Sequence, residues 1–419
     1  MTARRLVSLA TRPVSAPRRG GSAWRARLTS RLPLLLQAFA TLAVGGGCGE
    51  APLPAHSDEP LAEAVEAWRT GLGVPGVAVG VYRGSETLLE TGAGRADRAT
   101  GREVRADTPF CVGSVSKLFV AAAALRLASR GDLDLDAPLA RYGVDVPGSE
   151  DATLRMLGDH RAGFRNAITL QAVKDTFTAA PAQRWTRSDL LALTDGAEPH
   201  FAPGEGWTYS NTNTLLLADA MERATGLPWD SLLAREVTRP ADLTATARAH
   251  DGCGADPAAA RGYQLGDDRA PTPWRSRGDS LHDVTADHPS KWGASGDLRS
   301  TVLDLRQFAD AAFRGNLLTP EARAERDRAV ETGEVGYRYG FGLEVRGEGD
   351  AQILGHCGAI PGYNACLGYR PSDDATVIVL TNVYGTERSA MPALAISRAA
   401  FQWLAARPRT PSPSHASPS

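Results

Sequence analysis

Apolar residues recur at intervals of three or four positions through the middle of the chain and form short runs near both ends of it. An interval of three or four positions is typical of helices that bury one face, and short apolar runs bounded by turn residues are typical of strands. The pattern predicts helices at residues 61–68, 117–129, 187–193, 214–225, 302–313 and 386–404. It predicts strands at residues 76–82, 86–91, 340–346, 351–357, 365–369 and 376–380.

The predicted strands therefore lie near the beginning and the end of the predicted domain, and most of the predicted helices lie between them. We expect an α+β fold, in which an antiparallel sheet is flanked by helices and carries an inserted, mostly helical lobe. A ligand site would lie between the lobe and the sheet. Residues 251–287 are rich in Gly, Asp and Pro without a period, and we expect a long surface loop there.

The first 48 residues have a different composition. Eight arginines and no acidic residue precede residue 32, an apolar run follows at 32–44, and three glycines lead to Cys48. This order predicts an export signal at 1–48, and its apolar run is short for a membrane span. The small residues before Cys48 resemble a bacterial lipoprotein site, so Cys48 is a candidate for lipidation and membrane attachment. We expect a periplasmic, lipid-anchored or secreted protein with a linker at 49–60, one domain at 61–406 and a disordered tail at 407–419.

Composition adds exclusions rather than a function. The chain of 419 residues is 42% hydrophobic and 22% charged, with a formal net charge of −2, as in ordinary globular proteins. That balance predicts no nucleic-acid partner, and we expect a monomer. Five cysteines without metal-type spacing favour free buried thiols, although Cys357 and Cys366 could face each other across a hairpin.

Candidate chemistry begins with the scarcity of lysine. Only three residues are lysines, and one of them, Lys117, lies three positions after Ser114 at the start of an apolar helix. Positions three apart share a helix face, and a desolvated lysine, unlike an arginine, can act as a base. The spacing is that of a serine nucleophile with a lysine partner. The alternative is a helix cap at Ser114 with a solvated Lys117.

Two further segments carry candidate groups. Tyr209 and Asn211 follow a loop with two glycines, where the phenol could take the serine proton and Asn211 could bind a substrate amide. His356 and Gly358 lie on a late predicted strand that could pair with substrate backbone. Each also has a structural reading: an aromatic core anchor before an Asn cap, and a structural histidine.

In this order, Ser114 to Lys117 (S-x-x-K), Tyr209 to Asn211 (Y-x-N) and His356 to Gly358 (H-x-G) resemble the motifs of the penicillin-recognising serine hydrolases. These comprise class C β-lactamases, D-alanyl-D-alanine carboxypeptidases, and esterase and D-aminopeptidase relatives. The similarity also covers residues 131–136, 203–213, 293–298 and 355–363.

The resemblance implies a β-lactamase/transpeptidase-like fold and an acyl-enzyme mechanism without metal or organic cofactor. It implies Ser114 as nucleophile, Lys117 as its activating partner and Tyr209 as general acid/base. Asn211, His356, Gly358 and Ala359 would bind substrate, and His356 would orient Tyr209 or the substrate. The backbone N–H groups of Ser114 and Ala359 would form the oxyanion hole.

One departure bears on the substrate, which is a small molecule or a peptide. Carboxypeptidase relatives carry an arginine after Y-G-x-G-L and hydroxyls beside the final glycine, which hold the substrate carboxylate. Here Glu344, Cys357 and Ala359 occupy those positions. We therefore expect activity on esters, D-amino-acid amides or β-lactams. The alternatives are a D-alanyl-D-alanine carboxypeptidase and a non-catalytic penicillin-binding or sensing protein.

Overall fold

The computed structural model describes residues 53, 59–193, 197–266 and 280–407. All of these belong to the second of two units, residues 1–38 and 39–419. The predicted leader, Cys48 and nearly all of the predicted tail lie outside the described residues, so their predictions stay untested. Within the described ranges, no helix has both the length and the apolar character needed to cross a membrane.

The helices and strands follow the predicted order. The helices are α1 Leu61–Leu72, α2 Ser116–Ser129, α3 Leu154–Gly158, α4 Gln171–Ala179, α5 Arg187–Ala192, α6 Asn211–Thr225, α7 Trp229–Leu233, α8 Val302–Ala309, α9 Pro320–Asp327 and α10 Pro392–Ala405. The strands are β1 Gly76–Arg83, β2 Glu86–Gly94, β3 Phe110–Cys111, β4 Ala247–Arg248, β5 Tyr263–Gly266, β6 Ser280–Asp283, β7 Leu298–Ser300, β8 Val330–Glu334, β9 Tyr337–Tyr339, β10 Glu344–Arg346, β11 Ile353–Ile360, β12 Tyr363–Arg370 and β13 Ala375–Thr381.

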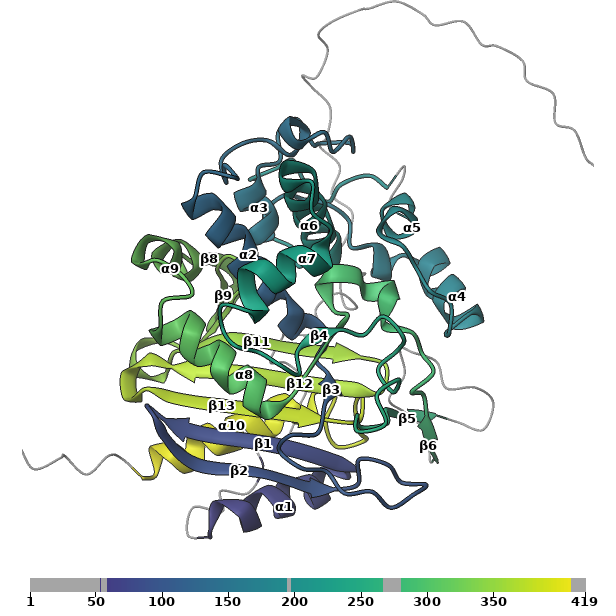
Figure 1. The fold of residues 1–419 in the computed structure, drawn as a ribbon, viewed down its shortest axis with the longest axis vertical. Helices are drawn as coiled ribbons and strands as arrows, with labels where there is room; N and C mark the ends of the chain where they lie inside the picture. Colours follow the sequence, from purple (N-terminus) through teal and green to yellow (C-terminus); the bar gives the residue numbers. More distant parts are fainter. Residues whose placement is uncertain (1–52, 54–58, 194–196, 267–279, 408–419) are drawn as a thin grey trace, which may run out of the picture. The chain divides into compact units, whose positions relative to one another are not determined.

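A large antiparallel sheet forms the centre of the fold, in the order β2-β1-β13-β12-β11-β10-β9-β8 (Figure 1). The N-terminal hairpin joins the C-terminal strands where β1 pairs with β13, for example Val79 with Val379. The chain between β2 and β8 supplies the mostly helical lobe. The predicted α+β class and its sheet-and-lobe arrangement are confirmed.

The strands β1, β11, β12 and β13 are buried on both faces of the sheet, so they read as largely apolar runs, whereas the edge strands β2 and β8 are partly exposed. Val377 and Val379 of β13 pack on one face with α1 and α10, whereas Ile378 and Leu380 pack on the other face with the lobe. Figure 1 shows α8 on the lobe side and α10 on the far side of β13. The lobe core and the lobe-facing sheet surface form one continuous apolar cluster.

Three predictions about the later part of the chain need correction. Residues 251–287 are not loop throughout, because β5 and β6 pair within them as a small sheet. The strand predicted at 340–346 is confined to β10, because Gly342 adopts φ 65° and Gly340 donates a backbone hydrogen bond to Leu343. The prediction of free thiols is wrong for four of the five cysteines.

These four cysteines form two disulfides. Cys111 of β3 is bonded to Cys253 at a sequence separation of 142, and Cys357 of β11 to Cys366 of β12 at a separation of 9. The first ties the strand that precedes the candidate nucleophile to the chain after β4. The second crosslinks neighbouring strands of the large sheet on the face covered by α1 and α10.

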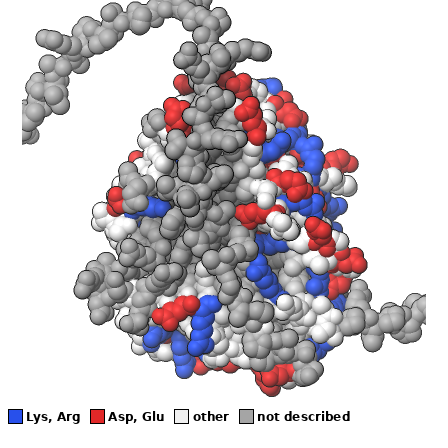
Figure 2. All heavy atoms as spheres, turned by 180° about the vertical axis from the view of Figure 1, so that it is seen from behind, with Lys and Arg blue, Asp and Glu red and all other residues white. Residues whose placement is uncertain are grey.

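Charge is spread over the surface, in keeping with the small net charge. On the face shown in Figure 2, basic and acidic side chains of the described residues are intermixed rather than separated by sign. Long-range steering of a charged partner needs an extended patch of one sign, and this face has none among those residues.

Candidate active site

Ser114 lies at the junction between β3 and α2. The chain leaves β3, makes a single 3-10 turn at Gly113–Val115, and continues directly into α2. Gly113 has φ 53°, and a Cβ there would lie 2.9 Å from the backbone nitrogen of Ala359. Glycine is therefore required at position 113 for two reasons: the left-handed backbone conformation and the close approach of β11.

The side chain of Ser114 is held between two groups that can move protons. Lys117 Nζ lies 3.0 Å from Ser114 Oγ, and the Tyr209 hydroxyl lies 2.9 Å from the same oxygen. Neither the 3-10 turn nor α2 has a side-chain cap, so Ser114 does not act as a helix cap. Lys117 is only 2% exposed, which also excludes the solvated charge considered above.

The hydrogen-bond partners of Lys117 allow its amine to accept a proton only from Ser114. Nζ donates to the carbonyl oxygens of Asn211 (Oδ1, 2.6 Å) and Ser295 (backbone, 2.9 Å), which can only accept. In the neutral amine, these two bonds use both N–H groups, and the lone pair is directed at the third neighbour, Ser114 Oγ. Burial holds the pKa of Lys117 well below its usual value, against the opposing charge of Glu344, and so favours this neutral form.

Tyr209 is half-buried and keeps its proton. Burial raises the pKa of its phenol above the usual value, even though the hydrogen bond with Ser114 favours the phenolate. Its position follows from the turn that ends at Ser210, immediately before α6 begins at Asn211. A protonated phenol 2.9 Å from Ser114 Oγ is placed to donate rather than to accept.

Asn211 lies deeper than a substrate ligand was expected to lie. Its Oδ1 accepts from Lys117, and its backbone N–H and Nδ2 are directed at Asn166 Oδ1 at 3.3 and 3.4 Å. In this structure, its side chain positions Lys117. Asn166 was missed in the sequence because an isolated asparagine carries no pattern, and Ser295 was missed because it acts through its backbone carbonyl.

The chain around Ser114 is packed closely against β11. Cys357 and Cys366 are a close pair with Cα atoms 4.1 Å apart, a spacing typical of a non-hydrogen-bonded pair in an antiparallel ladder. Cys357 and, two residues on, Ala359 therefore point their N–H groups away from β12. A Cβ on Gly358 would lie 2.5 Å from the Ser114 nitrogen. The segments that carry the N–H groups of Ser114 and Ala359 are therefore in close contact, and their role as an oxyanion hole stays a prediction.

His356 is on the lobe-facing side of β11, but its hydrogen-bond partner is Tyr339 of β9 rather than Tyr209. Its Nε2 lies 3.0 Å from the Tyr339 hydroxyl, and its Nδ1 lies 2.5 Å from the Cys357 carbonyl, to which it donates. Burial lowers the pKa of His356 to about 4, so the ring is neutral at pH 7 and its Nε2 accepts from Tyr339. The ring centroids of His356 and Tyr209 are 6.2 Å apart.

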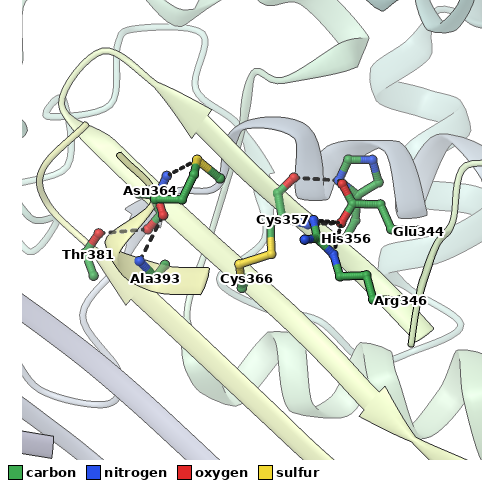
Figure 3. Close-up of a disulfide and its surroundings, with 9 residues drawn as sticks. Glu344, Arg346, His356, Cys357, Asn364, Cys366, Thr381 and Ala393 are labelled. Carbon is green, nitrogen blue, oxygen red and sulfur yellow. Dashed lines mark hydrogen bonds and ion pairs between the residues drawn. A yellow bond between two sulfur atoms is a disulfide. The ribbon is translucent and has the colours of Figure 1, made fainter. Parts of the chain in front are cut away.

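An ion pair lies next to His356. Glu344 Oε2 accepts from Arg346 Nη2 at 2.6 Å and from the Cys357 backbone N–H at 3.1 Å. Figure 3 shows both charged side chains and His356 on the side of Cys357 that faces away from its disulfide partner. Burial opposes ionisation of Glu344, but Arg346 and its hydrogen bonds keep the pKa of the carboxyl below its usual value. The sequence did not predict that Glu344 and Arg346 are partners.

Comparison with known proteins agrees with this geometry. The model of the Beta-lactamase family matches residues 61–400. A D-aminopeptidase of Brucella ovis is 28% identical over 349 residues, which cover 80% of this chain and 61% of that protein. The chain thus spans about three fifths of the length of this relative.

Solved structures show the same fold. The D-stereospecific amidohydrolase from Streptomyces sp. is 26% identical, with a TM-score of 0.69 over 81% of this chain and 97% of that chain. The D-amino acid amidase from Ochrobactrum anthropi SV3, complexed with D-phenylalanine, is 25% identical, with a TM-score of 0.71 over 83% and 100%. With the family model covering most of its length, and with this fold, the chain belongs to the β-lactamase family and is a serine hydrolase.

Proposed function

We propose that this hydrolase cleaves amides and esters of D-amino acids through an acyl-enzyme on Ser114. The observation that carries the proposal is the position of Ser114 Oγ, 3.0 Å from the Lys117 amine and 2.9 Å from the Tyr209 hydroxyl. A nucleophile with a base on one side and an acid on the other has what acyl transfer requires.

The reaction follows from the two proton positions. The lone pair of neutral Lys117 takes the Ser114 proton while Oγ forms a bond to the substrate carbonyl carbon. The N–H groups of Ser114 and Ala359 stabilise the oxyanion, and losing one such donor typically costs about 3 kcal/mol of transition-state stabilisation. Tyr209 protonates the leaving amine or alkoxide as its bond to carbon breaks. The Lys117 ammonium then returns a proton to the Tyr209 phenolate before water attacks the acyl-enzyme. Water then repeats the sequence on the acyl-enzyme and releases the acid.

The choice of substrate rests on the side chains around His356. Binding a free substrate carboxylate here would need an available cation, and the guanidinium of Arg346 is already paired with Glu344. The side chain of Cys357 offers no hydrogen-bond donor, because its sulfur is bonded to Cys366. Substrates whose carboxyl group is blocked as an amide or ester avoid this requirement. The relatives reported above, a D-aminopeptidase, a D-stereospecific amidohydrolase and a D-amino acid amidase, support the same class of substrate.

The test compares kcat/KM on one preparation for D-alanine p-nitroanilide, its L isomer, a p-nitrophenyl ester, a β-lactam and a peptide ending in D-Ala-D-Ala. The D-anilide and the ester should lead, and the peptide with a free carboxylate should be poorest. A phosphonate probe should add mass to the peptide containing Ser114, and Ser114→Ala should abolish both labelling and turnover. Preference for the D-Ala-D-Ala peptide would favour a carboxypeptidase instead. Labelling without turnover would favour a penicillin-binding protein.

We also propose that the mature chain acts outside the cytoplasm. The basic leader with its apolar run supports this, and so do the two disulfides, which persist in oxidising compartments. Fractionation of a bacterial host and N-terminal mass analysis decide the question. A processed chain that begins near Cys48 is expected, and an unprocessed cytoplasmic chain would contradict export. Lipidation of Cys48 and the monomeric state stay predictions, which lipid labelling and light scattering would test.

A further inference from the structure

His160 adopts a backbone conformation that its side chain disfavours. It lies just after α3 with φ 64°, one of three non-glycine residues with positive φ in the described ranges, together with Asp242 and Asp374. The left-handed conformation costs roughly 1–2 kcal/mol for a residue with a Cβ. His160 is also only 1% exposed, whereas Asp242 is exposed. Strain at a buried residue persists only where its surroundings hold it in place.

His160 contacts Tyr209 and the residues directly before and after it in the sequence. Its carbonyl accepts from the backbone N–H of Thr208 at 3.2 Å, and its Nδ1 faces the N–H of Ser210 at 3.5 Å. Its ring packs against the Tyr209 ring at a centroid distance of 4.6 Å. The residues before and after Tyr209, and the tyrosine ring itself, are thus all in contact with this one histidine.

The hydrogen bonds also define the state of the imidazole. Nδ1 accepts from Asn213 Nδ2 at 3.1 Å, so the proton is on Nε2. Burial keeps the pKa of His160 well below its usual value, so the ring is neutral. Among the described residues, Nε2 has no hydrogen-bond partner, and a buried unpaired donor costs about 1–3 kcal/mol. His160, which packs against the proton donor Tyr209, therefore carries two free-energy costs: its strained backbone and its unpaired Nε2.

The His160 ring also contacts Tyr339, which is hydrogen-bonded to the third motif. The Tyr339 ring lies 4.6 Å from His160, and the Tyr339 hydroxyl is hydrogen-bonded to His356 Nε2. His160, Tyr339, Tyr209 and His356 thus form one cluster of rings, in which Tyr209 also lies 6.1 Å from Tyr339 and 6.2 Å from His356 between ring centroids. His160 was not among the candidate residues of the sequence analysis.

We propose that His160 is a positioning residue for the acyl-transfer reaction, which fixes the Tyr209 phenol against Ser114 Oγ and links it to the His356 segment. The proposal rests on the function proposed above. His160 touches no reacting atom, so its effect passes through Tyr209. Loss of the ring leaves Tyr209 free to rotate away from Ser114, and a displacement of about 1 Å at a reacting group can cost about 10²-fold in rate.

The test uses two substitutions that tolerate positive φ. His160→Gly removes the ring and relieves the strain, and His160→Asn keeps a short polar side chain at the same backbone angle. With D-alanine p-nitroanilide, His160→Gly should lower kcat by about 10²-fold, while KM changes by less than about threefold. Asp242→Gly is the matched control, because it relieves the same type of strain at an exposed site and should leave kcat unchanged.

A double-mutant cycle separates positioning from general structural support. In a Tyr209→Phe background, His160→Gly should lower the phosphonate-labelling rate of Ser114 by less than about threefold, because the group that it positions is already absent. Equal losses in both backgrounds would overturn the proposal, as would an unchanged kcat in His160→Gly.

A measurement that does not depend on turnover distinguishes the role of His160 from the proposed function. A crystal structure of His160→Gly or His160→Asn should show the Tyr209 hydroxyl beyond hydrogen-bond distance of Ser114 Oγ. If the unmodified protein hydrolyses none of the substrates and is not labelled, the proposed function fails, and this distance alone decides the role of His160. A phenol that stays at 2.9 Å in both variants would refute that role.

Discussion

The carboxylate of Glu344 accepts a hydrogen bond from the backbone N–H of Cys357, although the two strands no longer pair through their backbones at that point. Backbone pairing of β10 with β11 ends where Glu344 lies opposite Gly355. The side chain of Glu344 thus satisfies the next donor along β11. The following donor on that side is the N–H of Ala359, which the proposed function assigns to the substrate oxyanion.

Glu344→Gln should change both stability and selectivity. Glutamine can still accept from Cys357, but Arg346 loses its counter-ion, and breaking a buried pair in this way costs about 3 kcal/mol of unfolding free energy. The released guanidinium should raise kcat/KM for a D-Ala-D-Ala peptide relative to a D-alanine anilide. Denaturant unfolding and the ratio of the two rates measure these effects.

The double substitution Glu344→Gln/Arg346→Gln provides the control for that prediction. It removes both charges, so most of the lost stability should return and the gain on the free-carboxylate peptide should disappear. An unchanged substrate ratio in Glu344→Gln would show that Arg346 has no access to the substrate.

Lys117→Arg should lose several orders of magnitude in kcat/KM while the protein still folds. Arginine cannot give up its proton, whereas the pKa of Lys117 is lowered by burial. The reactive form is the neutral amine, so the rate of the unmodified enzyme should rise with pH through an apparent pKa below 10.5 and then level off. Lys174→Arg is the matched control on α4, and its pH–rate profile should match that of the unmodified enzyme. Near-normal turnover in Lys117→Arg would mean that the lysine serves only as a fixed charge.

Gly358→Ala should abolish acylation with little loss of secondary structure. The added methyl group would lie 2.2 Å from the Val112 carbonyl oxygen and 2.5 Å from the Ser114 nitrogen, both of which are backbone atoms. The segment that carries Ser114 must therefore move away from Ala359, which separates the two oxyanion donors. Gly71→Ala is the matched control, since nothing lies within 4 Å of the added carbon. Phosphonate labelling of Ser114 measures the effect, and an unchanged labelling rate would place the oxyanion hole elsewhere.

The two disulfides should contribute unequally to stability. In the chain-entropy model, a crosslink that closes a loop of about 140 residues stabilises by about 5 kcal/mol, and one that closes about 10 residues by about 3 kcal/mol. Replacing Cys111 and Cys253 by alanine should therefore lower the unfolding free energy by about 2 kcal/mol more than replacing Cys357 and Cys366. Urea unfolding of the two double variants compares them directly, and equal losses would contradict this ranking.

Features with a local cause could be predicted from the sequence. The start of α2 and the 3-10 turn before it depend on neighbouring residues, and the spacing of Ser114 and Lys117 directly gives their contact. The apolar runs of β11 to β13 were also visible, because both faces of these strands are buried. The strands β8 and β9 were missed because β8, Val330–Glu334, is short, polar and partly exposed.

Features that depend on tertiary pairing were not predictable in the same way. Cys111 and Cys253 are 142 positions apart, and only the fold brings them together. The carbonyl of Ser295 holds Lys117 through an atom that every residue has, so its side chain gives no signal. Glu344 could be seen to differ from the family arginine, but its pairing with Arg346 could be established only once β10 was placed.

The pairing of β1 with β13 has a consequence for how the protein is made. Val79 cannot meet Val379 until nearly the whole chain has left the ribosome, so the large sheet has a high contact order and closes late. Ser114 and Lys117 are synthesised early, yet the strand that carries Ala359 joins them only after the lobe has been added. A chain of this topology therefore cannot complete its active site until its synthesis is nearly finished, whatever local helices have formed before then.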